Sequence, residues 1–301
     1  MNPPKIFGGS SNPNLAKSLS QKSKITLGQI EIGRFADGEI DVWVKDDVNN
    51  SNVFVLQSLS NPVNENIIEL ALICDALKRS GAHRINAITP YLAYGRKEKQ
   101  ARKGEPISAK VIAEIIVKSG VDKVICLDLH ADAIVGFFDV PVISLSAQEV
   151  LAKKLNGEKL QKPIVVAPDV GGVRRARNFA SLLDAPLAVI EKHRHTHLRD
   201  HAEVLSMSGE VSGDTAIIID DVISTGGTII EAAQALKGKG VKKVIVCATH
   251  GVFAGDAIKK LNESVIDKII VTDSIGQIQK SPKIEVVSVS DLIASTLQEE
   301  I

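Results

Sequence analysis

The chain has 301 residues, with 36 Lys+Arg against 36 Asp+Glu, so its formal net charge is zero. Hydrophobic residues make up 44%, charged residues 24% and aromatic residues 3%, which indicates a globular protein of two domains at roughly 100–200 residues each. A zero net charge argues against bulk binding to nucleic acid or anionic membranes, because both require a basic surplus. Apolar runs such as Ala216–Ile219 are far shorter than the roughly 20 residues of a membrane span. Met1–Lys5 does not resemble a secretory signal. We therefore expect a cytoplasmic protein with neither nucleic acid nor membrane as a partner.

The predicted elements alternate between short β-branched runs and longer segments of helical period. In the first half, strands are predicted at 52–57, 84–89 and 123–129, and helices at 63–80 and 107–118. In the second half, strands are predicted at 163–167, 185–190, 215–219, 243–248 and 268–271, and helices at 172–183, 228–237 and 254–261. Strands that are apolar throughout and alternate with helices are typical of parallel sheets covered on both faces. We predict an α/β fold with two tandem units, 1–145 and 146–301, with the last helix returning to the first unit.

The cysteines, Cys74, Cys126 and Cys247, are odd in number, far apart and embedded in apolar stretches. This placement predicts buried thiols rather than a disulfide or a zinc site.

The strongest local signal is the segment 217–228, in which a predicted strand ends in Asp220 and Asp221 and a turn of Ser, Thr and Gly opens a helix. In an open α/β sheet, ligands bind where strand ends meet helix starts. The glycines allow backbone N–H groups to approach a phosphate, and the helix start adds partial positive charge. A bare Thr-Gly-Gly-Thr is also compatible with an ordinary capped turn. With two carboxylates upstream, it resembles the phosphoribosyl-pyrophosphate (PRPP) loop of the type I phosphoribosyltransferase fold. That resemblance implies a pentose 5-phosphate site at Asp220, Asp221, Ser224, Thr225, Gly226, Gly227 and Thr228.

Four further segments resemble the ribose-phosphate pyrophosphokinase family and follow its order along nearly the whole chain. They are 33–39, 105–110, 124–142 and 166–177. The resemblance implies an enzyme that transfers the diphosphoryl group of ATP to the 1-hydroxyl of ribose 5-phosphate, giving AMP and PRPP for nucleotide, histidine and tryptophan biosynthesis. It also implies Mg²⁺ as the cofactor and a homo-oligomer, from dimer to hexamer.

His130 and Asp169 each follow a predicted strand, and the resemblance makes them metal-binding residues. An imidazole nitrogen and a carboxylate oxygen suit Mg²⁺ that is held mainly by phosphates and water. A histidine at a strand end is otherwise most often structural. Asp128 and Asp132, which flank His130, are interpreted as supporting residues.

The ATP contacts implied by the family are Phe35, Asp37, Gly38, Glu39, Arg96 and Lys97. Phe35 offers an apolar face for adenine, while Asp37 and Glu39 offer acceptors for its amine; without the resemblance, this stretch predicts only a turn. In the family, it reaches into the ATP site of an adjacent subunit. Arg96 and Lys97 belong to a basic cluster at 96–103 that suits phosphate oxygens. The chain reads Arg-Lys-Glu where bacterial and animal enzymes typically read Arg-Gln-Asp, so the base contact of Lys97 stays open.

Lys192 and Arg194 map onto the family's catalytic flexible loop, with His193 in place of the middle arginine. His193, His195, His197 and His201 could suggest a metal site, but a solvated mobile loop is the preferred interpretation.

Three expectations complete the sequence-based picture. Ser224 stands where the family often has Asp, so a carboxylate contact to ribose is expected to be missing. Asp47 and Asn49 replace a serine and an arginine of the phosphate-activated class, which predicts weak or absent phosphate activation. The rival functions are a phosphoribosyltransferase, which normally has one shorter domain, and a non-catalytic regulatory homologue of the synthetase, which would be expected to lose loop or metal residues.

Overall fold

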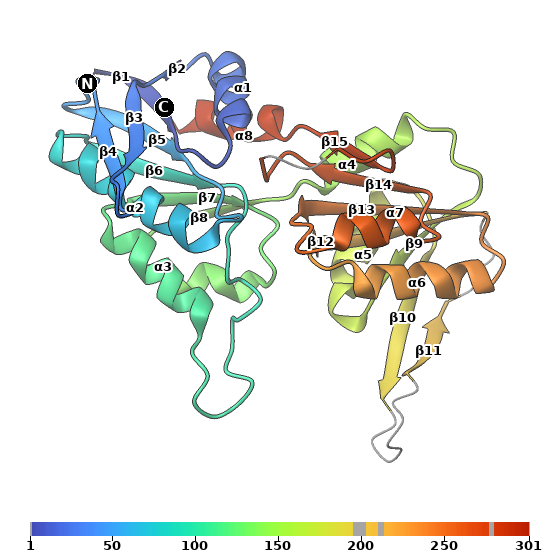
Figure 1. Ribbon diagram of the computed structural model, residues 1–301. Helices are drawn as coiled ribbons and strands as arrows, with labels where there is room; N and C mark the ends of the chain where they lie inside the picture. The colour runs from blue at the N-terminus through green and yellow to red at the C-terminus, as the bar shows by residue number, and fades with distance from the viewer. Residues whose placement is uncertain (1, 195–202, 210–213, 277–279, 301) are drawn as a thin grey trace. The chain divides into compact units, whose positions relative to one another are not determined.

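The structure, a computed structural model, describes residues 2–194, 203–209, 214–276 and 280–300. The chain forms two compact units, coloured by position along the chain in Figure 1. The first unit comprises Met1–Ser146, Asp273–Gln277 and Ser288–Ile301, and the second comprises Ala147–Thr272 and Ile278–Val287. The chain therefore leaves the second unit at Thr272 and returns to it before its last helix joins the first unit.

The first unit is built on a six-stranded sheet, in which all strand pairs are parallel, with strand order β2-β1-β5-β6-β7-β8. A two-stranded antiparallel hairpin, β3–β4, is attached to it. The elements are β1 Asn2–Gly8, α1 Pro13–Ser23, β2 Thr26–Leu27, β3 Ile30–Arg34, β4 Ile40–Val44, β5 Ser51–Leu56, α2 Val63–Arg79, β6 Arg84–Thr89, α3 Ser108–Lys118, β7 Lys123–Leu127, the 3₁₀ helix η1 Asp132–Phe137, β8 Val142–Leu145 and α8 Ser290–Glu299.

The second unit is built on a seven-stranded sheet with strand order β11-β10-β9-β12-β13-β14-β15. All its pairs are parallel except β10–β11. The elements are α4 Gln148–Asn156, β9 Pro163–Ala167, the 3₁₀ helix η2 Val170–Gly172, α5 Val173–Leu182, β10 Leu187–Arg194, β11 Glu203–Ser208, β12 Thr215–Ile223, α6 Gly227–Gly238, β13 Lys243–Gly251, α7 Ala257–Glu263, β14 Lys268–Thr272 and β15 Ile284–Val287.

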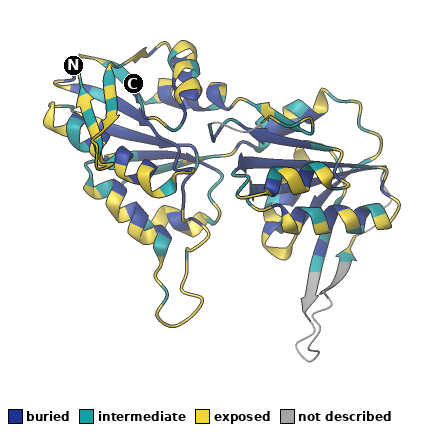
Figure 2. Cartoon of the chain, viewed as in Figure 1, coloured by how far each residue is buried: buried dark blue, intermediate teal, exposed yellow. Residues whose placement is uncertain are grey.

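The central strands are buried on both faces, which explains why they are apolar throughout. In β12, Ala216 and Ile218 pack with α6, while Ile217 and Ile219 pack with α4 and α5, because successive strand residues point to opposite faces. Each fully buried isoleucine side chain contributes about 1.5–3 kcal/mol relative to an exposed one. Figure 2 shows this pattern in both sheets, with buried strands in dark blue and helices that alternate between blue and yellow.

The predicted fold class, two mainly parallel sheets flanked by helices, is confirmed. Several predicted boundaries were wrong by a few residues. Strand β12 runs to Ile223 rather than to residue 219, because its pairing with β13 continues as far as Gly251. Asp220 and Asp221 therefore lie within the strand and not beyond its end. Helix α7 begins at Ala257, three residues later than predicted.

The three cysteines are free and buried, as predicted. Burial raises the pKa of the Cys74 and Cys126 thiols to about 12, so both stay protonated at neutral pH. No helix in the described part of the chain combines the length and the apolar character needed to cross a bilayer.

Candidate active site

The second sheet reverses its strand order between β9 and β12, because β10 and β11 lie on one side of this point and β13 to β15 on the other. Such a reversal splays the connections that follow the two strands and opens a crevice in which α/β proteins bind their ligands. Asp169 follows β9, and Asp220 and Asp221 lie near the carboxyl end of β12. The predicted ribose carboxylates and one predicted metal ligand thus share one edge of one sheet.

The turn that links β12 to α6 is open to ligands. Thr225, Gly227 and Thr228 are exposed and Ser224 is half-buried. Gly226 caps α6 with a φ of 80°, in the left-handed region that favours glycine, and no side chain caps the helix. The first amides of a helix have no partner within it, so the start of α6 presents N–H donors to an anion. The five residues predicted for the 5-phosphate loop, 224–228, therefore lie at the start of α6, where backbone N–H donors are available to a ligand.

Arg175 of α5 binds both carboxylates. Its Nη1 donates to Asp220 Oδ1 at 2.9 Å, and its Nη2 lies 3.1 Å from Asp221 Oδ1. Burial and the neighbouring Asp221 carboxylate raise the pKa of Asp220, while the Arg175 guanidinium opposes that rise. Arg175 lies in the 166–177 segment that resembles the family, but its contact with the two carboxylates was not predicted. The available signal was its place on the helix that follows Asp169.

The corresponding point of the first sheet, between β1 and β5, is closed. Gln57, Ser58, Leu59 and Ser60, which follow β5, are all buried. Ser58 Oγ donates to the carbonyl of Ser274 at 2.6 Å, and Gln57 Nε2 donates to Glu69 Oε1 at 2.8 Å. The chain's own polar groups form hydrogen bonds with this loop, so these buried residues are not open to a ligand as the turn before α6 is.

Asp169 is exposed at the end of β9, and its Oδ1 accepts the Gly172 N–H at 2.9 Å. Because this bond uses one carboxylate oxygen, the other can serve a ligand. Asp169 and Arg175 lie beside the same backbone position, since a Cβ placed on Gly172 would be 3.7 Å from Asp169 Oδ1 and 3.9 Å from Arg175 Nη1.

His130 belongs to the first unit and is exposed. The predicted end of the preceding strand at residue 129 was wrong: β7 stops at Leu127, so His130 lies in the connection to η1 and not directly after a strand. The segment 94–98 packs beside it, because a Cβ on Gly95 would lie 3.6 Å from His130 Cβ. Burial raises the pKa of Glu98. A hydrogen bond within that residue and the charges of Lys99 and His130 together lower this pKa by more, so it lies below its usual value. The charges of Glu98 and His130 therefore interact.

The predicted ATP residues lie in two exposed segments of the first unit. Phe35, Asp37, Gly38 and Glu39 form the tip of the β3–β4 hairpin, where Phe35 is 56% exposed. Arg96 and Lys97 are exposed, and Lys97 Nζ lies 3.6 Å from Glu105. Both segments are tied to the start of α2, because Arg34 pairs with Glu65 and the Tyr94 hydroxyl donates to Asn64 at 2.6 Å. The two predicted ATP segments are thus anchored to the same end of α2.

The backbone of Lys192 and Arg194 lies in β10, paired with β11 through Leu205 and Glu203. The expectation of a loop at these two residues was wrong, because their backbone belongs to a strand. His195, His197 and His201 fall outside the described residues.

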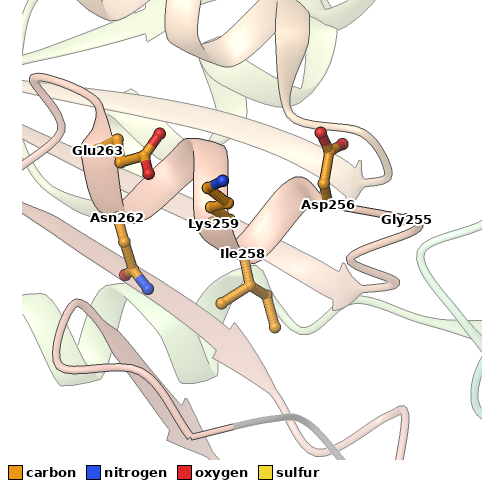
Figure 3. Close-up of a pocket in the computed structure, with 6 residues that line it drawn as sticks. All are labelled: Gly255, Asp256, Ile258, Lys259, Asn262 and Glu263. Atoms are coloured by element: carbon orange, nitrogen blue, oxygen red, sulfur yellow. The ribbon is translucent and has the colours of Figure 1, made fainter.

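A further surface cavity of about 430 Å³ lies along α7 (Figure 3). It is lined by Gly255, Asp256, Ile258, Lys259, Asn262 and Glu263, none of which the sequence predicted as a site residue. Helix α7 nevertheless packs beside the turn that opens α6, because Leu261 lies where a side chain on Gly226 would extend. The cavity marks the outer face of a supporting helix.

Together, the two mainly parallel sheets and the open switch point of the second unit are typical of an α/β protein of the phosphoribosyl-binding class. Residues 4–120 match the N-terminal domain of ribose phosphate pyrophosphokinase, and residues 200–300 match the phosphoribosyl synthetase-associated domain. The chain belongs to the ribose-phosphate pyrophosphokinase family.

Full-length relatives agree with this assignment. The ribose-phosphate pyrophosphokinase of Fusobacterium nucleatum is 44% identical over 297 residues, covering 97% of this chain and 93% of the relative. The Aquifex aeolicus enzyme of the same name is 44% identical over 300 residues, covering 99% and 96%. The crystal structure of phosphoribosylpyrophosphate synthetase from Mycobacterium smegmatis is similar with a TM-score of 0.92 and 36% identity, covering 99% of each chain.

Proposed function

We propose that this protein is a ribose-phosphate diphosphokinase, which transfers the β,γ-diphosphoryl group of ATP to the 1-hydroxyl of ribose 5-phosphate and releases AMP. The observation that carries the proposal is the uncapped start of α6 beside the Asp220–Asp221 pair at an open switch point. A helix start binds the 5-phosphate, and carboxylates accept hydrogen bonds from ribose hydroxyls. Full-length identity to enzymes of this name supports the same activity.

Each predicted residue takes a role in this reaction. The backbone and hydroxyls of 224–228 hold the 5-phosphate, and Asp220 and Asp221 orient the ribose. Phe35, Asp37, Gly38 and Glu39 bind the adenine, with Arg96 and Lys97 serving ATP. Lys192 and Arg194 stabilise the charge that develops on the transferring group. Because little covalent work falls to the protein, positioning and charge supply most of the rate.

The residues present suit magnesium. Asp169 offers a carboxylate oxygen and His130 an exposed imidazole, and Mg²⁺ typically takes few protein ligands while phosphates and water complete its shell. We propose each of them as a ligand, and the bound ion would neutralise charge on the phosphate oxygens. We further propose a cytoplasmic homo-oligomer, from dimer to hexamer, in which the β3–β4 tip serves the ATP site of a neighbouring subunit. The exposed Phe35 suits a contact with a neighbouring subunit. The three free thiols suit the cytoplasm, where disulfides are rare.

The testing experiment is ³¹P NMR of the purified protein with Mg²⁺, ATP and ribose 5-phosphate, with a control that lacks ribose 5-phosphate. Equal amounts of AMP and PRPP, seen only with the sugar phosphate present, are expected. ADP in place of AMP would indicate ordinary kinase chemistry. The absence of turnover would favour a regulatory homologue that needs a catalytic partner subunit.

We also propose that phosphate does not activate this enzyme steeply. Asp47 Oδ1 accepts the Asn49 N–H at 2.9 Å in the exposed turn before β5. A carboxylate in this turn repels an anion. A phosphate titration of the initial rate at fixed Mg²⁺ is expected to be flat, and a steep rise would contradict the proposal.

A further inference from the structure

We propose that Arg175 is a positioning residue that holds Asp220 and Asp221 as a fixed acceptor pair for the neighbouring hydroxyls of the pentose. This inference rests on the proposed function, in which the two carboxylates orient the ribose. It adds a residue that makes no predicted contact with the substrate and acts on it through the pair.

The geometry is that of a fork across two carboxylates. One guanidinium nitrogen donates to Asp220 Oδ1 at 2.9 Å, and the other lies 3.1 Å from Asp221 Oδ1. Asp220 Oδ1 also accepts the N–H of Asp221 at 2.9 Å. Two donors on one oxygen fix the rotation of the Asp220 carboxylate. Only a planar guanidinium supplies two donors at this spacing, because the lysine ammonium is a single point charge.

Burial shows which carboxylate faces the ligand. The side chain of Asp221 is 5% exposed, that of Arg175 17% and that of Asp220 21%. Asp221 therefore lies underneath, with Arg175 binding it from α5, and Asp220 keeps more surface for a hydroxyl. Arg175 opposes the rise in the pKa of Asp220. Without the arginine, the two close carboxylates would repel each other more strongly and Asp220 would keep a proton to higher pH, which places a donor where the sugar needs acceptors.

Arg177 provides a matched control on the same helix. It is exposed, two residues beyond Arg175, and carries the same charge. A general loss of positive charge from α5 would affect both arginines, whereas loss of the fork affects only Arg175.

The test compares Arg175→Gln, Arg175→Lys and Arg177→Gln in the full chain. Steady-state kinetics would give kcat and the KM values for ribose 5-phosphate and ATP, and calorimetry would give the Kd for ribose 5-phosphate alone. Arg175→Gln is expected to raise the KM for ribose 5-phosphate by about 10- to 100-fold, the range for loss of hydrogen bonds to charged groups, with the KM for ATP within about twofold. Arg175→Lys should be intermediate, and Arg177→Gln should match the wild type.

A second readout is the preference for ribose 5-phosphate over 2-deoxyribose 5-phosphate. A fixed acceptor pair is left without a hydrogen-bond donor when the 2-hydroxyl of the sugar is missing, so the wild type should prefer ribose 5-phosphate. Arg175→Gln should lose most of this preference. An unchanged KM for ribose 5-phosphate, or an equal rise in both KM values, would overturn the inference. If Arg175→Gln fails to fold, Arg175→Lys decides by the same split between the KM values. If the wild type makes no PRPP, the proposed function fails, and the calorimetric Kd still tests Arg175.

Discussion

Gly226 combines a backbone requirement with a packing requirement at the start of α6. Its φ of 80° strains any residue with a Cβ, and that Cβ would lie 3.2 Å from Leu261 Cδ2. Gly226→Ala is expected to lower the unfolding free energy of the second unit by about 1–2 kcal/mol. Gly227→Ala is the matched control, because a Cβ at Gly227 meets no atom within 4 Å. Urea unfolding of both variants checks this, and equal midpoints would contradict it.

Asp220 gives a pH-dependent prediction. Its folded pKa is raised by burial and by Asp221, from an ordinary value of 3.8 to about 8. Between these values, the folded state binds more protons than the unfolded state, so the stability of the wild type falls as pH rises. Asp220→Asn removes this titration, so its stability relative to the wild type should grow from pH 4 to pH 8 while ribose 5-phosphate affinity falls. Thermal unfolding at both pH values checks the sign. A disadvantage of the variant that deepens toward pH 8 would show that the Asp220–Arg175 pair dominates.

At this residue scale, the sequence indicated candidate ligand side chains but not the residue that binds them. Asp220, Asp221 and 224–228 could be proposed as a site because the pattern of a phosphate loop is local, with its donors and turn residues adjacent in the chain. Arg175 reaches the pair from 45 residues away, and only the folding of α5 onto β12 creates that contact. Long-range pairing of this kind leaves no periodic signal in one sequence.

At the element scale, the β3–β4 hairpin has a part that packs against the core and an exposed tip. Ile32 and Val42 pack against the core of the first unit, whereas Phe35 at the tip is 56% exposed. Phe35→Ala is therefore expected to leave stability within about 0.5 kcal/mol of the wild type. Loss of base stacking worth about 1–3 kcal/mol should raise the KM for ATP roughly 5- to 150-fold. Steady-state kinetics with varied ATP, and with ribose 5-phosphate as the second varied substrate, measures this effect.

Val42→Ala provides the reverse control for the hairpin. This substitution removes core packing without touching the tip, so it should reduce stability and leave the KM for ATP close to that of the wild type. If Phe35→Ala left the KM for ATP unchanged, the tip would not bind the base.

Elements with a strong local pattern agreed best with the sequence analysis. Buried strands such as β9 and β6 were predicted at their observed bounds, because a short apolar run between turn residues has few alternatives. The hairpin strands were expected only as unspecified neighbours of a turn at 35–39, and α1 was not predicted. β3 and β4 alternate exposed and half-buried residues, and the mean hydropathy of α1 is low, so neither shows a clear apolar run.

At the scale of the whole molecule, the first unit is completed by the end of the chain. Asn12 Nδ2 donates to the carbonyl of Asp273 at 2.7 Å, and the Asp273 carboxylate accepts the Val289 N–H at 2.8 Å. α8 packs against α1, and Lys123 of β7 pairs with Glu300. The last helix was expected to return to the first unit. The Asn12–Asp273 bond and the Lys123–Glu300 pair join residues more than 170 positions apart, which no local pattern shows.

This topology predicts where the effect of a mutation in α8 will appear. Leu297 is fully buried in α8, and its truncation to alanine should cost about 2–5 kcal/mol. Because each unit has its own core, hydrogen–deuterium exchange should accelerate in α1 and β1, nearly 300 residues upstream, while β12 and β13 stay protected. Leu236→Ala in α6 is the mirror control, since Leu236 is equally buried but belongs to the core of the second unit. It should accelerate exchange in β12 and β13 and spare α1. Uniform acceleration in both variants would mean that the two units unfold as one cooperative body, so that a substitution in α8 would also weaken the proposed pentose site.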